Sequence, residues 1–172
     1  MLLINIVMVK FAERDLIQSK MQTGRLLLQA LETQAESVLG GTHDNLAYAG
    51  STLFFERNMN KLLQAGDFSA ALMVSREGTK AFSFGSWDGA EEKTLSVSRE
   101  ALTTRKESFD FYGSTWGIIW LAHKRINIAT PIFLNGRLAG AAAISADLGP
   151  IYQTLRRSEK FILVYLFLNT MI

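Results

Sequence analysis

Cysteine is absent from this chain of 172 residues, and proline and histidine are scarce, with two residues of each. Without thiols the chain cannot form disulfides, thiolate zinc sites, iron–sulfur clusters or a covalently attached c-type haem. The signatures of serine hydrolases, zinc proteases, P-loop enzymes and dinucleotide-binding enzymes are also missing. We therefore expect this segment to be neither an enzyme nor a metal protein, and we expect no cofactor. A haem held by His43 and a methionine is the open alternative, although a polar helix start explains His43 more simply.

An excess of charge of one sign is also lacking, since 18 basic residues face 16 acidic ones. A nucleic-acid partner is therefore not expected, because such proteins present a dense basic face. Hydrophobic residues make up 48% of the chain and aromatic residues 10%. That content excludes intrinsic disorder and suffices for one domain with a sizeable core.

Charge is missing altogether from the two ends. The first charged residue is Lys10 and the last is Lys160, so residues 1–9 and 161–172 are uncharged. Each run is shorter than the roughly 20 apolar residues that cross a bilayer. We interpret residues 1–9 as the end of a first transmembrane helix and 161–172 as the start of a second; the alternative is two buried helix ends. Two such anchors would place the intervening domain on one side of the membrane.

The first polar segment reads as one long helix over residues 4–39, which Gly40-Gly41 ends. Its apolar and small residues follow spacings of four and three, as in a short heptad repeat. We expect its lower part to pack on the domain and its membrane-proximal part to meet a partner helix in a homodimer. The seam consists of Ile17, Met21, Gly24, Leu28, Leu31, Ala35 and Val38.

Shorter elements follow. Residues 43–65 read as one or two helices that end at Gly66-Asp67, and residues 69–75 and 80–84 as a hairpin. Residues 96–106 read as a short helix with Ser98 as a possible N-cap. Three further strands are then expected: residues 108–112 lead through Gly113 into 116–123, and 126–134 and 138–146 follow, with Asn135-Gly136 as the strongest turn signal. Asp147 is placed to cap an exit helix that leads into the C-terminal apolar run.

The expected architecture is α+β: a long N-terminal helix packs on a five-stranded antiparallel PAS-like sheet, and a C-terminal helix leaves it. The short helix and loops cover the opposite face. We divide the chain into the membrane-helix end 1–9, the long helix 10–40, the core 41–147, the exit helix 148–160 and the second membrane-helix start 161–172.

Residues 128–148 (IATPIFLNGRLAGAAAISADL) resemble the single-module Cache, or PDC, sensor domains of bacterial receptors. The matching features are a strand ending in Pro131-Ile132, the turn glycine Gly136, Gly140 near the start of the next strand, and Asp147 before the exit helix. The resemblance implies a periplasmic, small-molecule-sensing domain of an inner-membrane receptor. A sensor histidine kinase of a two-component system is the favoured output, with chemoreceptors and cyclic-dinucleotide enzymes as alternatives.

Aromatic and basic residues gather on the central strands and the short helix, where PAS-like folds hold their ligands. A small carboxylate would need a cation and an aromatic wall. We favour the face that carries Trp116 and Trp120, although these residues could equally belong to the core. The candidate ligand-binding residues are Tyr112, Trp116, Trp120, His123, Arg125, Arg105 and Asp147.

Two functions stay open at this point. In the first, ligand binding shifts a conformational equilibrium, and the exit helix moves against its partner in a dimer. In the second, large aromatic residues fill the pocket, and the domain is structural or binds a partner protein.

Overall fold

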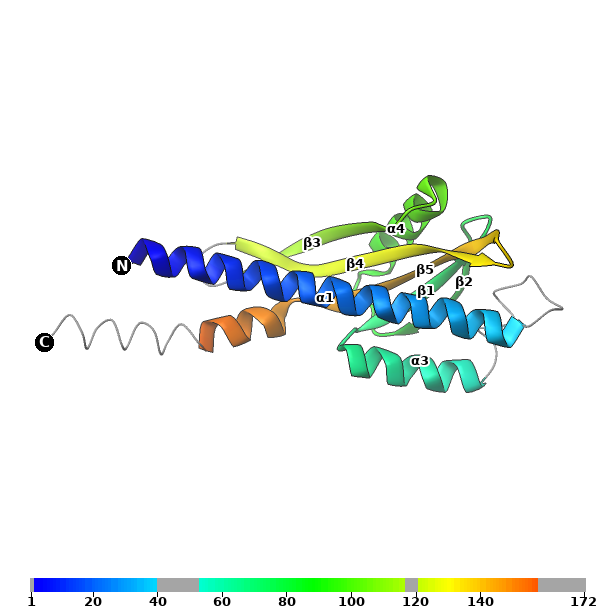
Figure 1. Ribbon diagram of the computed structural model, residues 1–172, viewed down its shortest axis with the longest axis horizontal. Coiled ribbons are helices and arrows are strands. Elements are labelled where there is room, and N and C mark those ends of the chain that lie inside the picture. The colour runs from blue at the N-terminus through cyan, green and yellow to red at the C-terminus, as the bar shows by residue number, and fades with distance from the viewer. Residues whose placement is uncertain (1, 40–52, 117–120, 158–172) are drawn as a thin grey trace, which may run out of the picture.

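The computed structural model describes residues 2–39, 53–116 and 121–157. Helix α1 is followed by α3, a hairpin of β1 and β2, helix α4, and three further strands (Figure 1). A helical segment at residues 149–157, which we call the exit helix, follows the last strand. The bounds are α1 Leu2–Leu39, α3 Leu53–Gly66, β1 Ala70–Ser75, β2 Lys80–Gly85, α4 Glu91–Thr104, β3 Ser108–Trp116, β4 Leu121–Leu134 and β5 Arg137–Asp147.

The five strands form one antiparallel sheet in the order β2-β1-β5-β4-β3. Helix α1 packs on one face against β4 and β5, and α4 packs against β1, β3, β4 and β5. The expected α+β fold, with the long helix on one face and the short helix on the other, is confirmed.

Helix α1 lies close to the sheet because its contact stripe contains a glycine. A Cβ added at Gly24 would meet Ile128 Cδ1 at 2.7 Å and Ile144 Cδ1 at 3.1 Å. Further along the helix, Leu28 and Leu31 are almost fully buried in the same core. This part of the predicted seam therefore packs on the domain itself. Contact of the membrane-proximal part with a partner helix stays a prediction.

The face beneath α4 is built from smaller side chains. Ala141 and Ala143 of β5 alternate toward α4, whose Val97 and Ala101 are buried against them. Short side chains on both elements let the helix approach the strands closely.

Two expectations about local structure were wrong. Ser98 does not cap α4, because the helix begins at Glu91 and Ser98 lies buried within it, donating to Thr94 O at 2.8 Å. Nor do residues 116–123 form one strand, since Trp116 ends β3 and pairs with Leu121 at the start of β4. The apolar sequence between them contains no asparagine or aspartate turn signal, so it resembled a continuous strand.

The predicted hairpin turn and exit-helix cap are confirmed. Asn135 and Gly136 have φ of 52° and 74°, as a type I′ turn requires. Asp147 Oδ1 accepts a hydrogen bond from Gly149 N at 2.8 Å. Tyr152 of the exit helix is 1% exposed, and burial, together with nearby Glu13 of α1, raises its pKa to about 12.

The division into membrane-helix ends and a sensor core stays a prediction. Within the described residues, no helix is both long enough and apolar enough to cross a bilayer. The predicted end of the long helix at Gly40-Gly41, the segment 43–52 and the C-terminal apolar run lie outside the described residues.

The close approach at Gly24 gives a first prediction. Replacing Gly24 by leucine should lower the free energy of unfolding by about 1–3 kcal/mol, because the new side chain would overpack the core at Ile128 and Ile144. Urea unfolding of the full chain measures the difference. Gln22→Leu, which adds leucine at an exposed position of the same helix, is the control and should change stability little. Equal effects of the two changes would contradict the packing account.

Candidate functional site

A group of polar side chains lies on the α4 side of the sheet. In the strand register Tyr112 of β3 lies opposite Arg125 of β4, and Asn127 of β4 lies opposite Ser145 of β5. Alternate strand residues share a face, so Arg125 and Asn127 point to the same side as Ala129, which packs beneath α4. The connection between β2 and α4 adds Trp87 and Asp88. We call these six residues the polar cluster: Trp87, Asp88, Tyr112, Arg125, Asn127 and Ser145.

Arg125 is the charged centre of the cluster and is only 5% exposed. Its guanidinium donates to Asp88 Oδ2 at 2.5 Å and to Trp87 O at 3.2 Å. Burial by itself lowers the pKa of Arg125, but the hydrogen bond to Asp88 and the nearby Tyr112 outweigh it and raise the pKa. The guanidinium therefore stays charged and joins the β2–α4 connection to the middle of the sheet.

Asp88 holds the other end of this ion pair at the surface. Its side chain is 64% exposed. Hydrogen bonds from Arg125 and Ser86 lower its pKa below the ordinary value. Asp88 and Gly89 have positive φ of 43° and 81°, and Ala90 N donates to Trp87 O at 2.7 Å. The connection thus turns tightly over Arg125 and leads directly into α4.

Several polar atoms of the cluster are buried without a hydrogen-bond partner among the described residues. They are Trp87 Nε1, Tyr112 Oη, Ser145 Oγ and both amide atoms of Asn127. Tyr112 lies close enough to Arg125 to help raise its pKa. Each such atom costs about 1–3 kcal/mol, and native proteins usually satisfy it with a ligand or an ordered water. Donors and acceptors are thus gathered in one place without protein partners.

The structure brings together two of the predicted ligand-binding residues, Tyr112 and Arg125, and places Asp147 next to them. Asp147 lies opposite Arg125 in the register of β4 and β5, but its carboxylate caps the exit helix. His123 stacks on Phe111 with ring centroids 5.2 Å apart, and both line a cleft against α1. His123 therefore contacts Phe111 and the cleft rather than the polar cluster.

The other candidates are scattered. Trp116 ends β3 and is 67% exposed, and Arg105 is the exposed C-cap of α4 with φ of 54°. Trp120 lies outside the described residues. Trp116 does not form an aromatic wall with the other candidates. The described residues therefore do not support the face that the sequence favoured. As ligand contacts, all seven residues stay predictions.

Four members of the polar cluster were missed by sequence reasoning. Asn127 and Ser145 each interrupt an apolar stretch within a strand, in the sequences INIA and AAAISA. A polar residue within a buried strand is unusual enough to have marked a site. Trp87 and Asp88 had no comparable signal, because a loop sequence does not reveal which strand residue it covers.

The described residues contain no group of three or more His, Asp or Glu residues that could hold a metal ion. The polar cluster has one buried cation and several neutral hydrogen-bonding groups. That combination suits a small organic anion or zwitterion.

The fold is similar to those of solved periplasmic sensor domains. The ligand-binding domain of the Pseudomonas aeruginosa amino-acid chemoreceptor PctC, in complex with GABA, matches with a TM-score of 0.53 and 17% identity over 90% of this chain and 63% of that one. The Vibrio cholerae LuxQ periplasmic domain matches with a TM-score of 0.59 and 10% identity over 88% of this chain and 68% of that one. The ligand-binding domain of Mlp24 with asparagine matches with a TM-score of 0.51 and 19% identity over 86% of this chain and 57% of that one.

These likenesses are of fold, since all three identities are low. The chain spans less than two thirds of the PctC and Mlp24 domains. No known family description matches the sequence, and no curated protein matches it. The resemblance to extracytoplasmic sensor domains expected from residues 128–148 is confirmed as a likeness of fold.

The Asp88–Arg125 pair predicts a pH-dependent contribution to stability. Because the pKa of Asp88 is lowered in the folded state, its stabilisation is complete above the ordinary value near 3.9 and is lost as pH falls through the lowered value. Asp88→Asn should therefore reduce the urea midpoint by more at pH 7 than at about pH 2. If the urea midpoints of the parent chain and Asp88→Asn differ equally at both pH values, the carboxylate charge does not stabilise Arg125.

Proposed function

We propose that this chain is the ligand-sensing domain of a bacterial membrane receptor and that the polar cluster binds the ligand. The observation that supports this most strongly is the set of buried polar atoms without partners around Arg125. A purely structural core would gain stability by replacing such atoms with apolar groups. The fold shared with periplasmic sensor domains supports the same reading.

The ligand that fits best is a small molecule with a carboxylate and an amino group. Arg125 offers a cation suited to a carboxylate, and Asp88 offers an anion at the surface suited to an ammonium group. Trp87 Nε1 and the Asn127 amide would add neutral hydrogen bonds. The solved domains of PctC and Mlp24 contain GABA and asparagine, which are both compounds of this kind. Entry of such a ligand would require the Asp88–Arg125 pair to open.

The exit helix is positioned to report this opening. Leu148 N donates to Lys124 O at 2.9 Å, next to Arg125 in β4. Leu148, Tyr152 and Leu155 are buried in the core beneath the sheet. A shift of β4 at Arg125 would thus be passed to the start of the exit helix, and ligand would favour one of two helix positions.

The same proposal covers the membrane anchors, the location and the oligomeric state of the domain. Residues 1–9 and 161–172 would continue into two membrane helices, and the domain would lie in the periplasm and form a homodimer along α1. A histidine kinase is the output we favour, with a chemoreceptor module or a cyclic-dinucleotide enzyme as alternatives. A structural or protein-binding domain with a filled pocket is the competing function.

Asn127→Leu separates ligand sensing from a structural role. The leucine removes two buried amide atoms that have no partner, so the unliganded chain should unfold at the same or a higher temperature. The stabilisation by ligand, roughly 2.7 kcal/mol at a hundredfold excess over Kd, should disappear. Thermal unfolding of the full chain with a panel of amino acids, amines and carboxylates measures both quantities.

Thr130→Val is the matched control, because it makes a similar polar-to-apolar change at a partly buried position of the same strand. It should keep the ligand response. If no compound stabilises the parent chain, or if Asn127→Leu alone unfolds it, the structural alternative gains support. A full ligand response in Asn127→Leu would remove Asn127 from the site.

A further inference from the structure

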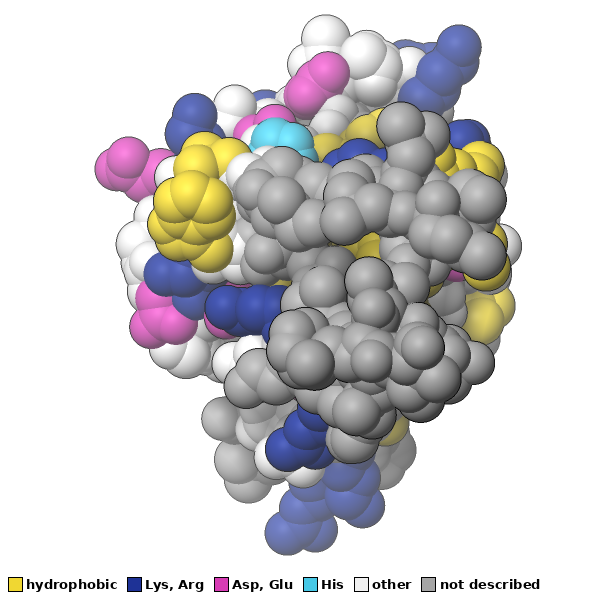
Figure 2. Space-filling view, turned by 90° about the vertical axis from the view of Figure 1, so that its left-hand side faces the viewer, with side chains coloured by type: hydrophobic (Ala, Val, Ile, Leu, Met, Phe, Trp, Pro, Cys, Tyr) yellow, Lys and Arg dark blue, Asp and Glu magenta, His cyan; other side chains and the backbone are white. Residues whose placement is uncertain are grey.

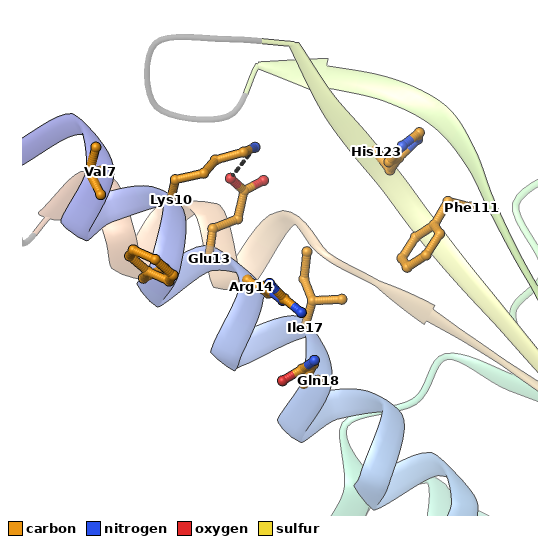
Figure 3. A pocket seen from close by; sticks show the side chains of 9 residues that line it. Val7, Lys10, Glu13, Arg14, Ile17, Gln18, Phe111 and His123 are labelled. Carbon is orange, nitrogen blue, oxygen red and sulfur yellow. Dashed lines mark hydrogen bonds and ion pairs between the residues drawn. The ribbon is translucent and has the colours of Figure 1, made fainter.

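A concave site lies on the α1 side of the sheet, the face opposite α4. The cleft has a volume of about 540 Å³, within the range of small-molecule sites. Its floor comes from the first half of α1, and Phe111 of β3 and His123 of β4 face it across the gap (Figure 3). The remaining lining residues, all on α1, are Val7, Lys10, Phe11, Glu13, Arg14, Ile17 and Gln18.

The walls of the cleft are apolar and its rim is mainly basic. Val7 and Phe11 are 43% and 57% exposed, although both are large hydrophobic residues. The polar side chains include Arg14 and the Lys10–Glu13 pair, whose atoms are 2.8 Å apart. An occupant with a long apolar part and an anionic end would complement both regions.

Exposed apolar side chains also surround the cleft. The described ranges contain nine exposed large hydrophobic residues. Seven of them lie on the first half of α1 or on β3 and β4 near the cleft, and only Leu26 and Phe133 lie elsewhere. Met8, Trp116 and Leu121 are each at least 65% exposed. Such a concentration at one end marks an interaction surface rather than a surface that faces only water.

This end is where the chain would meet the bilayer. The start of α1, the exit helix and the adjoining ends of β3 and β4 all lie at the left of Figure 1. Figure 2 views the molecule from that end and shows apolar, basic and acidic side chains around its edge. The uncharged run 1–9 includes the start of α1, and the uncharged run 161–172 follows the exit helix in the sequence. A tryptophan beside basic residues is typical of membrane–water interfaces.

We propose that the cleft between α1 and the β3–β4 pair takes up an acyl chain of an anionic membrane lipid. The chain lies against Val7, Phe11, Ile17 and Phe111, and the headgroup lies near Arg14. This inference rests on the proposed membrane tethering and adds a lipid site to it. Because α1 forms one wall and the sheet the other, bound lipid would stabilise their present separation.

The absence of cysteine makes a direct test possible. Gln18→Cys places a single thiol on the cleft for a fluorescent label, and Ser19→Cys places one on the next residue of α1, outside the cleft. Each labelled full-length chain is reconstituted in phosphatidylcholine–phosphatidylglycerol vesicles with acyl chains that carry a nitroxide quencher. The label at residue 18 should be quenched several-fold more than the label at residue 19. Equal quenching would overturn the proposal.

Two further variants test occupancy of the cleft. Ile17→Trp should fill it and reduce quenching at residue 18 to the level at residue 19, whereas Leu16→Trp, outside the lining, should not. Arg14→Glu at the exposed rim should weaken quenching in vesicles rich in phosphatidylglycerol and not in pure phosphatidylcholine. Quenching at residue 18 that survives both Ile17→Trp and Arg14→Glu would contradict lipid uptake.

Flotation of the same vesicles separates the two proposals. If the parent chain does not float with the vesicles, both membrane tethering and the lipid site are wrong. If it floats and residue 18 is not preferentially quenched, only the lipid site is wrong. Labels at residue 18 on two neighbouring chains could instead quench each other. If that quenching is lost when unlabelled chain is added, the cleft is an interface between two copies and not a lipid site.

Discussion

The ion pair between Arg125 and Asp88 determines how the α4 side of the sheet is organised. A guanidinium that is 5% exposed needs a charged or strongly hydrogen-bonding partner, since burying an unpaired charge costs several kcal/mol. The partner comes from the connection between β2 and α4, which is therefore held over the strand. Asp88 is mostly exposed, so water or a ligand can reach it. In the proposed function, a ligand carboxylate would replace Asp88 at Arg125, so that the cation would not be left unpaired.

The two faces of the sheet differ in how firmly they are covered. On the α1 side, Gly24 allows the helix to contact Ile128 and Ile144 directly, and a continuous apolar core follows. On the α4 side the apolar cluster is smaller, and the polar cluster lies beside it with unpartnered atoms. In the proposed function, the α1 face is thus a fixed base, and the α4 face holds the groups that would change partners. The exit helix packs on this base through Tyr152. It begins two residues after Asp147, which lies opposite Arg125 in the strand register.

Much of the fold could be predicted from the sequence because its signals are local. Asn135-Gly136 determines a turn by its own backbone preferences, and the apolar periodicity of residues 4–39 determines a helix. The strand boundary between Trp116 and Leu121 could not be predicted, since it depends on pairing between strands and not on a turn dipeptide. Ser98 was misread for a related reason: a serine that favours an N-cap also fits inside a helix when its hydroxyl bonds to the preceding turn.

The candidate site was less predictable than the fold. Tyr112 and Arg125 could be selected as polar residues near central strands, but their grouping depends on the register between β3 and β4. Asp88 joins them only because a buried arginine requires a partner from a segment 37 residues away. His123, two residues from Arg125 in sequence, faces the cleft against α1 instead. Simple alternation along one strand could not anticipate that separation.

The most direct test of the central claim is an NMR titration that follows the indole N–H signals of the full chain. Trp87 Nε1 is buried without a partner, whereas Trp116 lies exposed at the end of β3. An amino acid that binds the polar cluster should move the Trp87 signal in a saturable way and leave the Trp116 signal in place. A ligand that saturates the protein while the Trp87 signal stays unchanged would contradict the account and place binding elsewhere.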